Sequence, residues 1–235
     1  MHLTERKPGR SSHLEASFIT QRLGMAVLGF VFPLFFIVSS LAGHTNFQPS
    51  ISAYYWTHNL ERNFFVGALC AMGVFLVLYK GYTRLEDWIL NLAGVCAVGV
   101  AFAAMVKGSD CGPAGFSWHG FFAVTFFACI AAICIFMSQK SLEDEHDPAR
   151  KAAYLRRYWI CAAVMAASIT AAMVLKLMPL EKTKELCERG WTFWCESFAV
   201  WAFAAFWYIK TRELEPKRKA REAALAQGAP EKRGA

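Results

Sequence analysis

One carboxylate stands well inside an apolar stretch of this sequence. Glu196 follows Trp194 and Cys195, six residues into the stretch from Trp191 to Ile209. An ionisable side chain at membrane depth is costly, so its presence suggests a functional site. Such a carboxylate can pair with a cation, hold a ligand or take part in acid–base chemistry. Which of these it does depends on the polar groups that the fold brings to it.

Polar groups stand at the matching ends of other apolar stretches. His119 lies at the start of one stretch, and Arg62 comes just before another. With the topology predicted below, these groups lie at the outer membrane face, so we expect them to form one shallow site. Tyr54 and Tyr55 either line this site or anchor their loop at the interface. The predicted outer-face cluster consists of Tyr54, Tyr55, Arg62, Asp110, His119 and Glu196.

The favoured interpretation of this cluster is non-enzymatic. Glu196 could pair with Arg62 or His119 and lock helices together, or the cluster could bind a lipid headgroup or a small ligand. No complete catalytic set accompanies it, and the serines lack a nucleophile signature such as G-x-S-x-G. We expect no resident metal ion and no cofactor.

Two alternatives remain open. The first is a membrane-embedded, metal-dependent hydrolase of lipid amides or esters that uses His119, Glu196 and Asp110. The second is a small transporter or channel component. Few charged residues lie deep in the apolar stretches, and no pair of broken helices indicates a binding site at the membrane midplane.

Six apolar stretches predict an all-α bundle of transmembrane helices. A hydrocarbon core about 30 Å thick needs about 20 apolar residues of helix. Because lipid offers no partners to backbone polar groups, each stretch should be helical. The second stretch is short and must borrow residues from the preceding loop. The predicted spans are Leu23 to Ala42, Phe64 to Tyr79, Trp88 to Val106, Trp118 to Met137, Tyr158 to Met178 and Trp191 to Ile209.

Lysine and arginine positions predict the topology. Of the 25 such residues, 19 lie in the segment before the first stretch, in the second and fourth connections, and after the last stretch. Cations favour the cytoplasmic side, so both termini should be cytoplasmic. This divides the chain into a cytoplasmic segment 1–22, a membrane domain 23–209 and a basic tail 210–235. A cleaved signal peptide ending near Ala42 is an alternative, although its apolar part would be unusually long.

The overall composition agrees with a membrane protein. Hydrophobic residues make up 56% of the 235 residues and charged residues 18%, with a formal charge of +7. The excess of cations flanks apolar stretches and matches no nucleic-acid recognition pattern, so we expect membrane lipid and not nucleic acid as a partner. The oligomeric state stays open.

Two of the eight cysteines fall in predicted outer connections. Cys111 and Cys187 would face an oxidising compartment, which predicts a disulfide between them; the alternative is two free thiols. The other cysteines lie in apolar stretches, where Cys mostly acts as a small hydrophobic residue.

Local signals also place some helix ends and contacts. Asp147 before Pro148 predicts an N-cap that starts the fifth helix early. Small residues such as Gly94 and Ala97 in the third stretch should let helix backbones approach closely.

Six segments within residues 20–210 share a pattern: Ser50 to Tyr55, Arg62 to Leu69, Tyr79 to Tyr82, Asn91 to Ala93, His119 and Trp194 to Trp201. With these segments the chain resembles a bacterial family of six-helix membrane proteins of unknown function. The layout is also similar, more remotely, to the DRAM-like family of eukaryotic six-helix proteins. In that family a Ser in the first outer loop, a His that opens the fourth helix and a Glu in the sixth helix recur.

The resemblance implies a six-helix fold in a bacterial inner membrane and supplies no established reaction. It marks Arg62, His119 and Glu196 as shared positions. Asn63 stands where the bacterial pattern usually has Asp, and Lys107 with Gly108 replace Phe-Pro. These departures weaken a charge relay through the first outer loop.

Overall fold

The computed structural model describes residues 10–103, 105–107, 111–112, 115–143 and 145–226, and within these ranges the side chains of residues 17–214. Throughout this part of the chain the regular elements are helices and no strand is present. The elements are α1 (Arg10–Leu41), the 3-10 helix η1 (Ser52–Trp56), α2 (Asn59–Leu78), α3 (Arg84–Phe102), α4 (Trp118–Ala132), the π-helical turn η2 (Ile133–Met137), α5 (Ser138–Ser141), α6 (Pro148–Leu177), α7 (Leu180–Glu188) and α8 (Trp191–Ala226).

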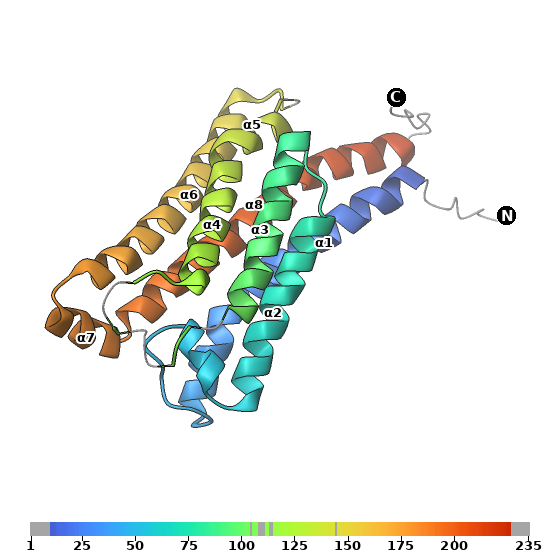
Figure 1. The fold of residues 1–235 in the computed structure, drawn as a ribbon. Helices are drawn as coiled ribbons and strands as arrows, with labels where there is room; N and C mark the ends of the chain where they lie inside the picture. The colour runs from blue at the N-terminus through green and yellow to red at the C-terminus, as the bar shows by residue number, and fades with distance from the viewer. Residues whose placement is uncertain (1–9, 104, 108–110, 113–114, 144, 227–235) are drawn as a thin grey trace.

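The long helices form a closed ring. In order around the ring, α1 contacts α2, α2 contacts α3, α3 contacts α4, α4 contacts α6, α6 contacts α8, and α8 returns to α1. Helices α1 and α8 leave the bundle together at one end, here called the terminal end, which also carries the 79–83 connection and α5 (Figure 1). The opposite end, here called the α7 end, carries η1, α7 and the 103–117 connection.

Five helices are long and apolar enough to cross a membrane, where the sequence predicted six. The missing one is Trp191 to Ile209, which is helical as the first part of α8 but is less apolar than the others. Its Trp, Thr and Ser residues and Glu196 lower its apolar character, so its crossing remains a prediction. The five helices are Ser17–Leu41, Asn59–Leu78, Arg84–Phe102, Trp118–Ser141 and Pro148–Leu177.

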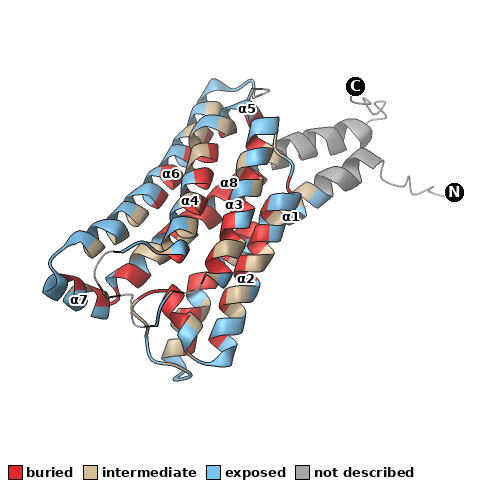
Figure 2. Ribbon diagram, in the orientation of Figure 1, coloured by how far each residue is buried: buried red, intermediate tan, exposed pale blue. Residues whose placement is uncertain are grey.

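The outward faces of these helices are apolar. Exposed apolar side chains recur one helical turn apart. Examples are Val27 and Val31 on α1, and Ile160 and Val164 on α6. Figure 2 shows long exposed strips along the outside of α6, away from the ring. Continuous apolar surface of this kind is unfavourable in water and favourable in hydrocarbon. The fold therefore indicates a multi-pass membrane protein.

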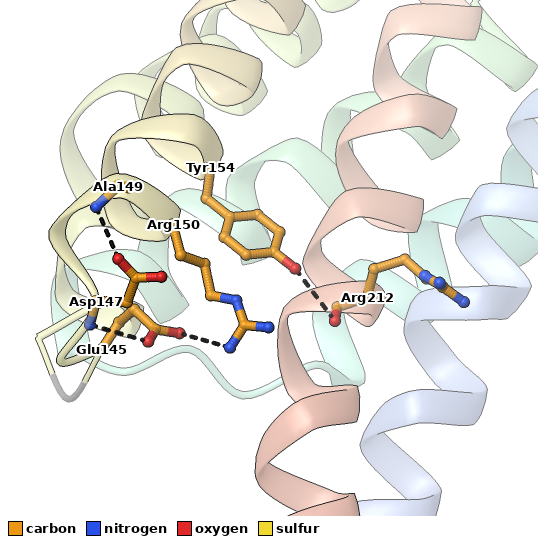
Figure 3. A network of polar contacts seen from close by, with 6 residues as sticks. All are labelled: Glu145, Asp147, Ala149, Arg150, Tyr154 and Arg212. Atoms are coloured by element: carbon orange, nitrogen blue, oxygen red, sulfur yellow. Dashed lines mark hydrogen bonds and ion pairs between the residues drawn. The ribbon is translucent and has the colours of Figure 1, made fainter.

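Capping residues, and not hydropathy, decide where several helices begin. Helix α6 begins at Pro148, ten residues before its predicted apolar stretch, because the Asp147 carboxylate accepts the Ala149 N–H at 3.0 Å. Beside this cap, Glu145 and Arg150 form an ion pair at 3.8 Å (Figure 3). The predicted early start of this helix is thus present in the structure.

Other helix boundaries also differ from the prediction. Helix α2 starts at Asn59 and not at Phe64, so the short second stretch does borrow residues from its loop. Helix α3 starts at Arg84, where the Thr83 hydroxyl accepts the Glu86 N–H. It ends at Phe102, four residues before the predicted end, and the backbone leaves the helical conformation at Ala103.

Helices α2 and α3 cross at a pair of glycines. A Cβ atom added to Gly94 would lie 2.6 Å from the Gly73 carbonyl oxygen, and one added to Gly73 would lie 2.8 Å from the Gly94 carbonyl oxygen. Neither backbone could give way without moving a helix. The small-residue stretch predicted to allow close approach is used at this crossing.

Replacing Gly94 with alanine should therefore destabilise the bundle by about 1–3 kcal/mol, because the new methyl group forces the two helices apart. Unfolding of the purified protein by SDS, followed by tryptophan fluorescence, would measure this. Gly67→Ala on α2 is the matched control, since a Cβ there meets nothing within 4 Å. Equal effects of the two substitutions would contradict the close crossing.

Candidate functional site

A cavity of about 590 Å³ lies among the ring helices in the half nearer the α7 end, and it opens outward past the exposed side chains of Phe121 and Met173. Helices α2, α3, α4, α6 and α8 all contribute to its wall. Most of the wall is aromatic or aliphatic, including Phe65, Leu69, Val100, Phe126 and Phe203. The polar residues that line it are mainly at the α7 end, and they include Ser52, His119, Lys176, Thr192 and Glu196. The cavity is thus amphipathic along its length.

Glu196 lines this cavity from the second turn of α8. Its Oε2 atom accepts the backbone N–H of Ile51 at 2.6 Å, and Ile51 immediately precedes η1. A short bond to a charged acceptor is stronger than an ordinary one. Glu196 therefore fastens the first connection to α8 through a backbone amide.

His119 lines the same cavity from the first turn of α4. Its Nδ1 lies 3.1 Å from the carbonyl oxygen of Ala103 and, because a carbonyl can only accept, this nitrogen donates. The ring stacks on Phe65, with centroids 6.5 Å apart. The imidazole is buried, so its orientation is fixed by α2, by the end of α3 and by α4. The structure thus brings His119 and Glu196 to one cavity.

The two predicted tyrosines do not line the cavity in the described part of the chain. Tyr54 is fully buried, with its hydroxyl 2.7 Å from Ser40 Oγ and its ring against Phe36. Tyr55 is half-buried and its ring meets Trp56. Both residues fix η1 beside the cavity.

Arg62 points elsewhere. Its side chain is exposed on α2 and donates to Asn59 Oδ1 at 2.8 Å, and it is not part of the described cavity wall. Asp110 lies outside the described residues. The predicted cluster is therefore divided: His119 and Glu196 share the cavity, the tyrosines support it, and Arg62 faces outward.

Cys111 and Cys187 are joined by a disulfide, as the sequence suggested for the outer connections. It ties the 103–117 connection to α7, a short helix that the sequence had not indicated. Gly190, in the left-handed conformation with φ +78°, ends α7 and donates to the Cys187 carbonyl at 2.8 Å, which turns the chain into α8.

A buried carboxylate at the α7 end was given no role in the sequence prediction. Glu61 is fully buried in the first turn of α2, and Ser39 Oγ donates to its Oε1 at 2.5 Å. Its other oxygen has no hydrogen-bond partner among the described residues. The sequence suggests only an acidic residue at a helix N-terminus, which is common at the surface, and so gave no sign of burial.

A second polar assembly at the terminal end was missed altogether. Its first part is Arg22 on α1, whose Nε donates to the Tyr79 hydroxyl at 2.9 Å and whose Nη1 donates to the Lys210 carbonyl at 2.7 Å. All three residues are buried. Burial raises the pKa of Tyr79, just beyond α2, to about 12, so the phenol stays neutral.

The second part surrounds the Lys210 ammonium. Its Nζ donates to Ser141 Oγ at 2.9 Å, Ser141 donates to Glu213 at 3.2 Å, and the Tyr158 hydroxyl donates to the same carboxylate oxygen. Burial lowers the pKa of Lys210, which follows the last predicted span, to about 8. Nearby, Tyr154 donates to the Arg212 carbonyl at 3.4 Å (Figure 3). The terminal-end cluster, defined by these contacts, is Arg22, Tyr79, Ser141, Tyr158, Lys210 and Glu213.

Helix α8 links the two polar regions. Glu196 and Phe203 line the cavity, Phe206 and Trp207 are almost fully buried one turn further on, and Lys210 then opens the terminal-end cluster. Among the described residues no group of three or more His, Cys, Asp or Glu side chains is arranged to hold a metal ion. The site is thus a hydrophobic cavity with a polar end.

The fold and site together define a class: an all-helical, multi-pass membrane bundle with an amphipathic cavity among its helices. No protein-family model, curated protein or solved structure matches the chain. The resemblance to the bacterial six-helix family and to the DRAM-like family therefore stays a prediction.

Proposed function

We propose that this protein binds a lipid-like amphiphile within the membrane. The observation that carries the proposal is the cavity of about 590 Å³, whose wall is mostly apolar and whose polar groups lie mainly at the α7 end. Cavities that hold small ligands commonly have about 300–1,000 Å³ and a few placed polar groups in an apolar wall. The apolar part of the ligand would lie along Phe65, Leu69 and Phe203.

The polar end of the cavity suits a headgroup. Glu196 supplies a carboxylate, His119 an imidazole, and Lys176 an ammonium group from the last turn of α6. The three side chains come from α8, α4 and α6, so a headgroup held among them would bridge three helices. Hydrogen bonds already fix Glu196 to Ile51 and His119 to Ala103, which keeps both groups oriented before a ligand arrives.

We further propose that the protein lies in the bacterial inner membrane with both termini in the cytoplasm. The departure of α1 and α8 from the same end supports termini on one side. The concentration of lysine and arginine around that end supports the cytoplasmic side. Six crossings, with α8 as the sixth, would be consistent with this arrangement.

Filling the cavity tests the proposal. Ala172→Phe should lower the amount of amphiphile bound by the purified protein at least about tenfold, because Ala172 lines the cavity and the new ring occupies the ligand's space. Displacement of a fluorescent fatty acid would measure binding. Ala167→Phe is the matched control, since Ala167 is exposed on the same helix and is not part of the cavity wall.

Equal binding by wild type and Ala172→Phe would contradict the proposal. Mass spectrometry of the extracted ligand separates binding from hydrolysis. Recovery of intact amphiphile would support a binding protein. Conversion of the amphiphile to a free acid by the wild type, lost in a folded Glu196→Gln variant, would instead support the hydrolase alternative.

A further inference from the structure

A second cavity, of about 280 Å³, lies at the terminal end, opposite the amphipathic cavity. It is bounded by α1, by the 79–83 connection and by α8 where that helix leaves the ring. The residues that matter for its chemistry are Phe18, Arg22, Tyr79, Lys80, Tyr82 and Leu214. Two cations and two phenols therefore meet two hydrophobic side chains, and no carboxylate belongs to its described wall.

Arg22 is the central group of this cavity. Its side chain is 3% exposed, yet its partners are the Tyr79 hydroxyl, the Lys210 carbonyl and the Tyr82 phenol, none of which is a carboxylate. Within the described side chains no carboxylate oxygen lies within 4.0 Å of its guanidinium nitrogens. A buried charge without a counter-charge is strongly unfavourable. An anion in the cavity would supply the missing negative charge.

The nearest carboxylates are directed to other groups. Glu86 accepts the backbone N–H of Tyr82 at 2.8 Å, and Asp87 accepts that of Gly81 at 2.7 Å. In the cluster beside Arg22, Glu213 is bonded to Ser141 and Tyr158. These bonds shape the 79–83 connection and the Lys210 environment, and none of them engages the Arg22 guanidinium.

The dimensions and lining indicate which anion fits. A guanidinium is well suited to phosphate because its planar donors can bond two oxygens, and it has five N–H groups, of which Tyr79 and Lys210 take three. Lys80 is exposed and adds a mobile second cation. Phe18 and Leu214 offer an apolar contact beside the charges.

From this geometry we propose that the cavity at the terminal end binds a phosphate group, held by Arg22 and Lys80 with Tyr82 beside them. The group could be carried by an anionic lipid headgroup or be free phosphate, and both share this chemistry. The site lies at the opposite end from the amphiphile cavity and does not depend on it.

The test uses the full chain in non-ionic detergent with added phosphatidylglycerol or phosphatidylcholine of the same acyl chains. Native mass spectrometry measures the lipid retained. Wild type should retain phosphatidylglycerol in clear preference to phosphatidylcholine. Lys80→Gln should weaken phosphatidylglycerol binding about fivefold, the effect of removing one favourable lysine at an anionic surface. A parallel series with inorganic phosphate as competitor distinguishes the two sources.

Lys140→Gln is the matched control, because Lys140 is an exposed lysine at the same end that is not part of the cavity wall. It should leave phosphatidylglycerol binding unchanged. Displacement of the lipid by phosphate would support a site for the free anion, and retention against phosphate would support a headgroup site. Equal retention of the two lipids by wild type, or equal losses in Lys80→Gln and Lys140→Gln, would overturn the proposal. Arg22→Gln, if it folds, should abolish the preference.

Discussion

Replacement of Glu213 with glutamine should lower the free energy of unfolding by about 3–5 kcal/mol. Glu213 is 3% exposed and is the carboxylate next to the buried Lys210 ammonium, to which it is connected through Ser141. Glutamine keeps the shape of the side chain and removes the charge, so Lys210 would remain buried without compensation. Unfolding by SDS, followed by tryptophan fluorescence, would measure the loss.

A double substitution separates charge compensation from simple loss of packing. Lys210→Met with Glu213→Gln should cost less than the sum of the two single substitutions, because no unpaired charge is left inside. Glu185→Gln on α7 is the control: its ion pair with Arg189 is exposed on both sides and should be worth at most about 1 kcal/mol. Strict additivity of the two buried substitutions would show that Lys210 and Glu213 are not coupled.

Loss of the Cys111–Cys187 disulfide should destabilise the protein by about 2–5 kcal/mol. The two residues are 76 positions apart, so the bond closes a long loop and restricts the unfolded chain considerably. The variant with both cysteines changed to serine should unfold at a lower SDS concentration than the wild type. Changing both residues avoids leaving a free thiol able to form new bonds.

Cys195→Ser provides the comparison, because Cys195 is a free, half-buried cysteine. Its effect should stay within about 1 kcal/mol. Alkylation of the unreduced, denatured protein should modify six of the eight cysteines, and all eight after reduction. Modification of all eight before reduction would show that Cys111 and Cys187 are free thiols.

Helix positions were largely predictable. The thickness and apolarity of the hydrocarbon core set how long and how apolar a membrane-crossing helix must be, and both properties can be read from the sequence. Trp118 and Trp191 begin α4 and α8 as predicted, and Asp147 starts α6 as a cap. Where predictions missed, a local interaction was stronger than hydropathy. Helix α3 begins at Arg84 because Thr83 caps it, well before the apolar stretch at Trp88.

The candidate site was predictable only in part. Glu196 and His119 were found because ionisable groups inside apolar stretches are conspicuous, and both line the amphipathic cavity. Arg62 was grouped with them because it lies at the same end of the bundle, but it faces outward on α2. Knowing that a residue lies at one end of a helix does not tell whether its side chain points into the bundle or away from it. That depends on how the helix packs against the neighbouring helices of the ring.

The sequence by itself determined that the chain forms apolar helices, roughly where they lie, and which residues cap them, because these depend on local hydrophobicity and short-range hydrogen bonds. Only the tertiary structure decided that Arg22, Lys210 and Glu213 are buried together. In the sequence they are separate charges flanking apolar stretches, which normally remain in water. The packing of α1 and α8 brings Arg22 to Tyr79 and to the Lys210 carbonyl, while Ser141 connects Lys210 to Glu213. It is this long-range packing that excludes water from them.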